Sequence, residues 1–366
     1  MIKGLVRPSY IAFSHLMGKA TKAFYPHFPY GPGRLTILPT TKCNLSCDFC
    51  SVKESLNAPE PGVLSLDEWK RVIDSIPIYT AVDFSGGEVF FAKNFIEMLE
   101  YFFQKPRASS IITNGSTLTK PIVEKFIDFK LPMFLVSLDG MASYHDRIRG
   151  KAGVFERATE MLGHMIEEKK RRKVSFPITC IKTVLTEDNA DQIPQLLEFA
   201  ERLGVDQIQF AIMYHNRLQM SFVTFKEFER PELIEGNSYA YPASVIPSIL
   251  NAVEQIFEFK KKSKMYVGMA PEMKTKEEVL QFIKDPKSIG VKSCGRPFTD
   301  LFLHGDGQLT GCISHDFGNI RDFDYDVQKT LKGPAAMAWL EHFKKQEDYY
   351  PVCEGCCRAV HTVKPK

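Results

Sequence analysis

The sequence predicts an α/β protein whose core is a partial (β/α)6 barrel of the TIM type, followed by a small cysteine-rich domain. Two observations lead to this prediction. Strand-like and helix-like segments alternate about six times between residues 34 and 215, and five of the nine cysteines lie after residue 290. Strands that alternate with helices form parallel βαβ units. Barrels built from such units carry their reactive groups at the carboxyl ends of the strands.

Residues 1–33 are expected to form a basic amphipathic arm. Basic residues but no acidic ones precede Asp48, and apolar residues recur at helical spacing between residues 13 and 24, before several prolines and glycines end the helix. One interpretation packs this helix across one end of the barrel, with its lysines in solvent. The other brings residues 8–24 to an anionic membrane surface or to an acidic substrate.

The barrel core is expected over residues 34–215. Its first strand, near residues 35–39, leads directly into a loop that holds three cysteines. Ser65 and Glu68 form a capping box, which predicts a helix that extends to about residue 76. The other expected strands are 81–84, 111–113, 134–138, 178–185 and 208–213, and the other expected helices lie near 94–104, 119–130, 153–172 and 189–203. The cysteine loop therefore follows a strand, where a barrel places its reactive groups.

Two further regions complete the chain. Residues 216–290 are expected to form a connecting helical region, with a helix from about 244 to 262, which leads into the second domain and contributes to the substrate pocket. Residues 291–366 form the cysteine-rich domain. A hairpin is expected there, with strands at 300–303 and 308–313 joined by a His-Gly-Asp-Gly turn.

Composition limits the class of protein, its partners and its cellular compartment. A chain of 366 residues with 44% hydrophobic and 25% charged residues has the make-up of a soluble globular protein. The net charge of +3 is too small to indicate a nucleic-acid partner, and none is expected. No apolar run approaches the roughly 20 residues that cross a bilayer. Clustered cysteines without a signal peptide favour metal ligation in a reducing cytoplasm over disulfides.

The chemistry of the chain is indicated first by Cys43, Cys47 and Cys50, which follow the spacing C-x3-C-x2-C. An Fe–S cluster of the cubane type takes four ligands, so three thiolates leave one iron open to another molecule. A zinc knuckle, or three unrelated buried cysteines, is the alternative interpretation.

A second motif, Gly86-Gly87-Glu88, follows the second expected strand, 36 to 38 residues after the third cysteine. Two glycines let a backbone approach a ligand closely, and a carboxylate can bind an ammonium group. A pair of glycines after a strand is often only a turn, but its place after the cysteine motif makes it specific.

These motifs resemble those of the radical S-adenosylmethionine (SAM) superfamily, over nearly all of residues 35–215. The resemblance implies a [4Fe–4S] cluster held by the three cysteines, with SAM bound to its open iron. It also implies an anaerobic enzyme, reduced by flavodoxin or ferredoxin. Such an enzyme cleaves SAM to a 5′-deoxyadenosyl radical, which abstracts a hydrogen atom from a substrate.

The resemblance assigns SAM-binding positions as well. It places Phe49 beside the adenine, Ser137 and Asp139 at the ribose hydroxyls, and Arg149 at the SAM carboxylate, with Arg147 as the alternative. The complete set of expected cofactor-binding residues is Phe49, Gly86, Gly87, Glu88, Asn114, Ser137, Asp139 and Arg149, where the Gly-Gly-Glu segment binds the methionyl amine and Asn114 ends the third strand.

The later cysteines resemble the SPASM and twitch extensions of that superfamily. Cys294, Gly307 and Cys312 fit C-x12-G-x4-C, and only five cysteines are present where a full SPASM domain has seven. The resemblance therefore implies one auxiliary [4Fe–4S] cluster. Its expected ligands are Cys294, Cys312, Cys353 and Cys356, with Cys357 either replacing Cys356 or remaining a free thiol. Zinc is the alternative metal.

Three functions stay open at this level. The first expectation is dehydrogenation or epimerisation of a small molecule such as a sugar, amino-sugar or lipid, aided by the auxiliary cluster. The alternative is a SPASM enzyme that modifies a ribosomal peptide or a protein. The third is an iron–sulfur scaffold without turnover. Epimerisation needs a hydrogen donor, for which Cys180 and Cys357 are the candidates.

Overall fold

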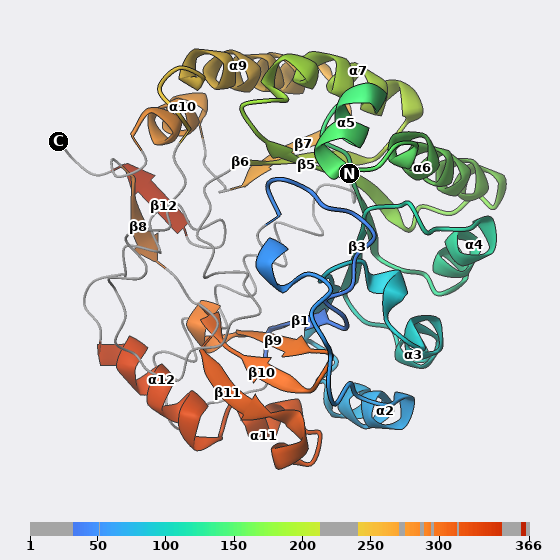
Figure 1. The fold of residues 1–366 in the computed structure, drawn as a ribbon, viewed down its shortest axis with the longest axis vertical. Helices are drawn as coiled ribbons and strands as arrows, with labels where there is room; N and C mark the ends of the chain where they lie inside the picture. The colour runs from blue at the N-terminus through green and yellow to red at the C-terminus, as the bar shows by residue number, and fades with distance from the viewer. Residues whose placement is uncertain are drawn as a thin grey trace.

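A curved sheet of ten strands organises the chain in the computed structural model (Figure 1). The structure describes residues 32–50, 52–212, 241–270, 275–285, 289–293, 296–312, 315–345 and 360–363. Across the sheet the strands follow the order β11-β10-β9-β1-β2-β3-β4-β5-β6-β7. Every pair from β9 through β7 is parallel, whereas β10 and β11 are antiparallel to their neighbours.

The ten strands are β1 (Arg34–Leu38), β2 (Ala81–Phe84), β3 (Ser109–Thr113), β4 (Met133–Ser137), β5 (Ile178–Leu185), β6 (Gln207–Ile212), β7 (Tyr266–Ala270), β9 (Asp300–His304), β10 (Gln308–Thr310) and β11 (Asp316–Asn319). A separate antiparallel pair consists of β8 (Ile289–Ser293) and β12 (Val360–Val363). This small pair brings the end of the described chain beside the segment that precedes β9.

Helices cover the outer side of the curved sheet (Figure 1). They are α2 (Leu66–Ser75), α3 (Phe95–Phe102), α4 (Lys120–Asp128), α5 (Ala142–Arg149), α6 (Val154–Arg171), α7 (Ile193–Leu203), α9 (Ile246–Lys262), α10 (Lys276–Lys284), α11 (Val327–Thr330) and α12 (Pro334–Lys345). The predicted capping box begins α2, since the Ser65 hydroxyl accepts from the Glu68 N–H at 3.3 Å and the Glu68 carboxylate accepts from the Ser65 N–H at 2.8 Å.

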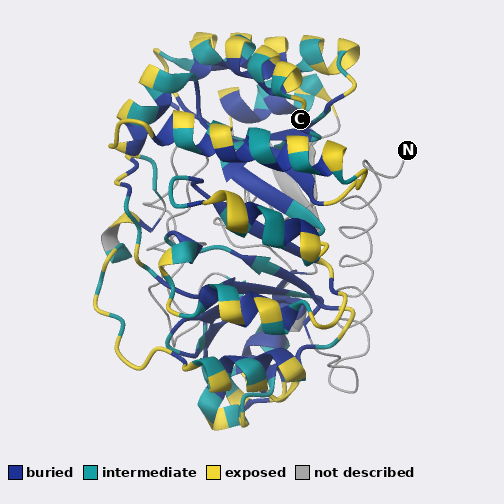
Figure 2. Cartoon of the chain, turned by 90° about the vertical axis from the view of Figure 1, so that its right-hand side faces the viewer, coloured by how far each residue is buried: buried dark blue, intermediate teal, exposed yellow. Residues whose placement is uncertain are grey.

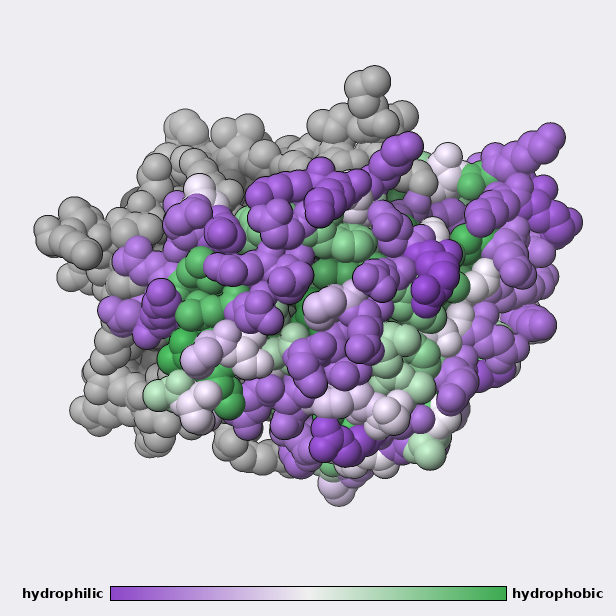
Figure 3. Space-filling model, turned by 90° about the horizontal axis from the view of Figure 1, so that it is seen from above, coloured by the Kyte–Doolittle hydropathy of each residue, from purple (hydrophilic) through white to green (hydrophobic). Residues whose placement is uncertain are grey.

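The two faces of the parallel sheet differ in chemistry because side chains alternate along each strand. The outer face carries the apolar residues of the main core, such as Ile37 and Phe84, which are fully buried with the inward sides of the helices (Figure 2). The inner face carries polar residues instead, including Thr36, Asp83 and Lys182. Outward helix surfaces are mostly hydrophilic, as the view from above shows (Figure 3).

The structure confirms the predicted fold class and places a strand at each of the six expected core positions. Several elements differ from the expectation. Helix α5 was not predicted, because its short sequence ASYHDRIR has no apolar stripe. The region expected to connect two domains, 216–290, supplies α9 and also β7, which extends the parallel sheet beside β6. The expected second hairpin strand ends at Thr310, and β11 adds a third strand.

Some predictions fall outside the described residues. The N-terminal arm is described only from residue 32 onward, so its expected helix remains a prediction. Within the described ranges, none of the helices combines the length and apolar character that a membrane span requires.

Candidate active site

The cysteine loop, residues 39–50, begins where β1 ends and is fastened to the end of α5. The Ser46 N–H donates to the Arg149 carbonyl at 3.2 Å, and the Asp48 N–H donates to the Ile148 carbonyl at 3.4 Å. Gly150 has a φ of 71°, which favours glycine, and a Cβ atom added there would lie 2.2 Å from the Ser46 hydroxyl. The middle of the loop is therefore held by the backbone at the end of α5, the helix that follows β4.

The three thiols of this loop share one small apolar cluster. Cys47 is buried with Leu45 and Val154, and the half-buried Cys43 and Cys50 pack against them. Burial raises the pKa of all three thiols. In the described part of the chain, no group of three or more His, Cys, Asp or Glu side chains lies within reach of a single metal ion. An iron–sulfur cluster contains several irons, and each thiolate binds its own iron. Three thiols in one apolar cluster therefore fit its donor set although they do not share a single ion.

The first half of the loop is fixed by a carboxylate that the sequence did not single out. Glu60 accepts from the Thr40 hydroxyl at 2.9 Å and from the Thr41 N–H. Asn57 accepts from the Cys43 N–H at 3.0 Å. Both residues lie in an ordinary polar loop before α2, and their contacts with the cysteine loop carry no local sequence signal.

The Gly86-Gly87 pair makes room for the cysteine loop. A Cβ atom on Gly87 would lie 2.3 Å from the Lys42 carbonyl oxygen, and one on Gly86, where φ is 131°, would lie 2.8 Å from the Thr40 carbonyl oxygen. The Glu88 N–H donates to the same Lys42 carbonyl at 2.7 Å. These glycines therefore allow two loops to touch, and their binding of a ligand stays a prediction.

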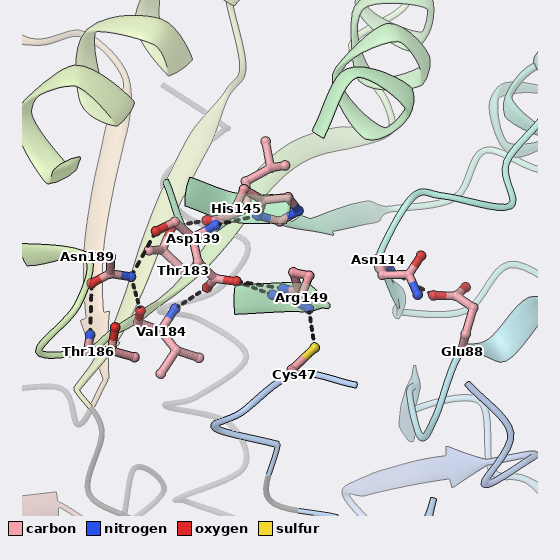
Figure 4. Close-up of polar contacts among 11 residues, drawn as sticks. Cys47, Glu88, Asn114, Asp139, His145, Arg149, Thr183, Val184, Thr186 and Asn189 are labelled. Atoms are coloured by element: carbon pink, nitrogen blue, oxygen red, sulfur yellow. Dashed lines mark hydrogen bonds and ion pairs between the residues drawn. The ribbon is translucent and has the colours of Figure 1, made fainter. Parts of the chain in front are cut away.

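The Glu88 carboxylate is 1% exposed and is held at the end of β3. It accepts from the Thr113 hydroxyl at 2.7 Å and from the Asn114 N–H at 2.8 Å (Figure 4). Burial raises the pKa of Glu88 to about 7, although these hydrogen bonds oppose the shift. The Asn114 amide nitrogen lies 3.9 Å from the Cys43 Sγ. Glu88, Asn114 and the cysteine loop thus meet at one edge of the sheet.

A buried ion pair completes this edge (Figure 4). Asp139, which is 0% exposed, accepts from the Val184 N–H at 2.9 Å through one oxygen and from Arg149 Nε at 2.7 Å through the other. Arg149 Nη1 lies 3.7 Å from the Cys47 Sγ, and the guanidinium lies 5.3 Å from the centre of the Phe49 ring. Both oxygens of Asp139 are therefore engaged within the protein.

His145 supports the same pair from α5. Its Nδ1 accepts from the Asp139 N–H at 3.1 Å, and burial lowers its pKa to about 4, so the ring is neutral near pH 7. Ser137, at the end of β4, is half-buried, which leaves it more accessible to a ligand than Asp139. Arg147, the alternative to Arg149, is exposed, with its guanidinium 4.7 Å from the centre of the Tyr144 ring.

The remaining sequence candidates lie elsewhere or outside the described residues. Cys180 is fully buried on β5, four positions before Val184, which corresponds to about 13 Å along a strand. It therefore lies away from the edge that holds the cysteine loop. Cys312 is half-buried just after β10. Four predicted ligands or donors lie outside the described residues, namely Cys294, Cys353, Cys356 and Cys357.

Three thiols at the carboxyl end of the first strand of a parallel (β/α) sheet, beside a Gly-Gly-Glu turn, define an iron–sulfur enzyme of the SAM-cleaving class. Residues 37–211 match the family model "Radical SAM superfamily", and the chain carries a radical SAM domain. Enzymes with this domain use a [4Fe–4S] cluster and SAM.

Curated relatives include enzymes with two kinds of substrate. The AdoMet-dependent heme synthase of Nitratidesulfovibrio vulgaris is 24% identical over 335 residues, which cover 87% of this chain and 82% of that protein. The sporulation killing factor maturation protein SkfB of Bacillus subtilis is 28% identical over 183 residues, which cover 48% of this chain and 41% of that protein.

Among solved structures, Streptococcus suis SuiB bound to its precursor peptide SuiA resembles this chain with a TM-score of 0.65. The superposition covers 95% of this chain and 73% of SuiB at 15% sequence identity. At that identity the likeness shows a shared fold, which extends beyond the radical SAM domain.

Proposed function

We propose that this radical SAM enzyme modifies a ribosomally made peptide or protein side chain, with the help of one auxiliary [4Fe–4S] cluster. The observation that carries this proposal is the site itself, in which the cysteine loop meets Glu88, Asn114 and the Asp139–Arg149 pair. The choice of a peptide rests on the similarity to SkfB, a maturation protein. It replaces the dehydrogenation or epimerisation of a small molecule that the sequence favoured.

The bound cluster and SAM supply a 5′-deoxyadenosyl radical, which removes a hydrogen atom from the substrate. The protein holds the three thiolates, positions the cofactor and excludes water. In this proposal Phe49 lies beside the adenine and the half-buried Ser137 meets the ribose. The Gly-Gly-Glu turn lies at the methionyl amine. Flavodoxin or ferredoxin is the proposed electron donor.

The inner face of the sheet supports a polar substrate over a lipid. Arg34 pairs with Asp83, which also accepts from the Ser110 hydroxyl. Lys182 lies on the same face, in register with Ser137 at the end of β4. Side chains of this kind match the amides and charges of a peptide. A lipid or isoprenoid chain offers no groups that could hydrogen-bond to such side chains.

The topology of the C-terminal region supports the auxiliary cluster. Strands β9 and β10 form a hairpin whose open end places Cys312 beside the segment that leads into β9. Ser293, the residue before Cys294, pairs with Val360, three residues after Cys357. The proposed ligands are Cys294, Cys312, Cys353 and Cys356, with Cys357 as the alternative to Cys356.

A tetrapyrrole is the second candidate substrate. One observation favours it: the similarity to the heme synthase continues over 87% of this chain, beyond the radical SAM domain. The carboxylates of a tetrapyrrole would also suit a cation such as Lys182 on the inner face.

The test begins with anaerobic reconstitution, a count of iron and sulfide, and formation of 5′-deoxyadenosine from SAM with dithionite. Close to eight irons per chain and deoxyadenosine are expected for two clusters. Peptides from cells grown in deuterated medium are then added. A peptide substrate is supported if deuterium is transferred to deoxyadenosine and if this transfer is lost when the peptides are first treated with protease. Transfer only with deuterated Fe-coproporphyrin III or related tetrapyrroles supports the second candidate, and no deoxyadenosine at all refutes both.

A further inference from the structure

The Arg149 guanidinium is fixed by the protein before any cofactor is considered. Its Nε and Nη2 both donate to one oxygen of Asp139, and Arg149 is 8% exposed while Asp139 is 0% exposed. A side chain held by two hydrogen bonds to a buried carboxylate has lost most of its rotamer freedom. Nη1 does not contact Asp139, and it lies 3.7 Å from the Cys47 Sγ (Figure 4).

The carboxylate that holds Arg149 is itself anchored from three directions. The other oxygen of Asp139 accepts from the Val184 N–H at 2.9 Å, and its backbone N–H donates to His145. Its backbone carbonyl accepts from the Asn189 amide at 2.9 Å. Asn189 in turn accepts from the Thr186 N–H at 2.9 Å. The position of the guanidinium is thus set by residues from the ends of β4 and β5 and from α5.

Arg149 also touches the cysteine loop through its backbone, since its carbonyl accepts from the Ser46 N–H at 3.2 Å. The backbone of Arg149 therefore contacts Ser46, and its side chain contacts Cys47. Cys47 is 8% exposed and is the most buried of the three cysteines of this loop. A charged donor to this sulfur is shielded from solvent. Electrostatic contacts are strongest when they are shielded in this way.

We infer that Arg149 is an outer ligand of the radical SAM cluster, which donates a charged hydrogen bond to the Cys47 thiolate and raises the reduction potential of that cluster. The expectation from the sequence, that Arg149 pairs with the SAM carboxylate, remains the competing assignment. Reduction adds negative charge to a cluster, and a cationic donor on a ligand sulfur stabilises the reduced form more than the oxidised form. Asp139 neutralises the guanidinium on its far side and keeps Nη1 directed at the sulfur.

The decisive measurement is the midpoint potential of the core cluster in the SAM-free protein, by EPR-monitored titration. The core cluster is recognised as the signal that changes when SAM is added afterwards. Loss of one charged hydrogen bond in R149Q is expected to shift the reduction equilibrium about tenfold, or about 59 mV for one electron, toward the oxidised form. R149K, which keeps the charge, should stay closer to the wild-type potential.

R147Q is the matched control, because Arg147 lies two positions earlier on α5 and is exposed over Tyr144. Its potential should equal that of the wild type. A wild-type potential in R149Q, together with weaker SAM binding to the oxidised protein, would overturn the inference and restore the carboxylate assignment. A residue that only supported the fold would change iron content or thermal stability without moving the potential of the cluster that remains.

A measurement on the wild-type protein covers the case in which R149Q does not assemble the cluster. Protein labelled with ¹⁵N-arginine is reduced without SAM and studied by pulsed EPR. A ¹⁵N coupling to the core cluster is expected, because the guanidinium contacts a ligand sulfur. A spectrum without that coupling would refute the hydrogen bond.

Discussion

Substitution of Gly87 by alanine should displace the cysteine loop. The added Cβ would lie 2.3 Å from the Lys42 carbonyl oxygen, 2.7 Å from the Thr41 carbonyl oxygen and 2.8 Å from the Lys42 carbonyl carbon. All three contacts are shorter than 3.0 Å and involve backbone, so no side chain can turn aside to relieve them. Either the Gly-Gly-Glu turn or the backbone next to Cys43 has to move by about 1 Å to reach ordinary contact distance.

The cost can be estimated from this geometry. Overpacking of this kind destabilises proteins by about 1–3 kcal/mol. A displacement of about 1 Å at a reacting centre can lower the rate about 100-fold. We therefore expect G87A to remain folded, to lose part of its core iron, and to form deoxyadenosine about 100 times more slowly. Iron analysis, circular dichroism and the deoxyadenosine assay measure the three quantities.

G163A is the matched control. Gly163 lies inside α6, and a Cβ there would have its nearest neighbour, Leu203 Cδ1, at an ordinary 3.7 Å. Alanine in a helix interior stabilises by about 1 kcal/mol relative to glycine. The control should therefore keep its iron and its activity. If G87A also kept full iron content and wild-type deoxyadenosine formation, the packing argument for the Gly-Gly pair would be refuted.

Three further predictions follow from the same contacts. Alanine at all three cysteines of the cysteine loop should abolish deoxyadenosine formation and leave about four irons per chain; iron-free protein would contradict the auxiliary cluster. C180A should retain deoxyadenosine formation and product formation, since Cys180 is fully buried below the site; lost product would restore it as a hydrogen donor. Arg321 lowers the pKa of Glu68 from 4.5 to about 2, so the ionised carboxylate stabilises the fold above pH 4.5 and the effect fades as the pH falls toward 2. In urea unfolding, E68Q should thus cost about 1–2 kcal/mol at pH 7, with a smaller difference from wild type at pH 3; an equal difference at both pH values would refute the assigned charge.

Much of the barrel could be predicted because its signals are local. The capping box of α2 lies within four residues, and the alternation of apolar segments with helices places each core strand near its observed position. The cysteine loop follows β1 directly, so its place at the carboxyl edge needs only the sequence order and the rule for parallel strands. Helix α5 escaped prediction because only one of its three buried residues, His145, Ile148 and Arg149, is apolar.

The site was harder to predict because its partners lie far apart in the sequence. Glu60 holds Thr40 and Thr41 from 20 and 19 residues away, and Arg149 reaches Cys47 across 102 residues. A motif identifies that such a residue matters, but only the fold shows which of its atoms are already engaged. Asp139 illustrates this point, since both of its oxygens already accept hydrogen bonds from the protein, while its contact with the ribose stays a prediction.

The C-terminal hairpin belongs to the same structural unit as the cysteine loop. Strand β9 pairs with β1 along its full length, and a Cβ on Gly305 would lie 2.4 Å from the Pro39 carbonyl oxygen. Arg321 ties the hairpin to the first turn of α2, donating to the Asp306 carbonyl at 2.7 Å and to Glu68 at 2.7 Å. Since Pro39 is the first residue of the cysteine loop, a shift of the hairpin moves backbone that positions the core thiols. The region proposed to hold the auxiliary cluster is therefore mechanically joined to the core site through β1, whichever substrate the enzyme accepts.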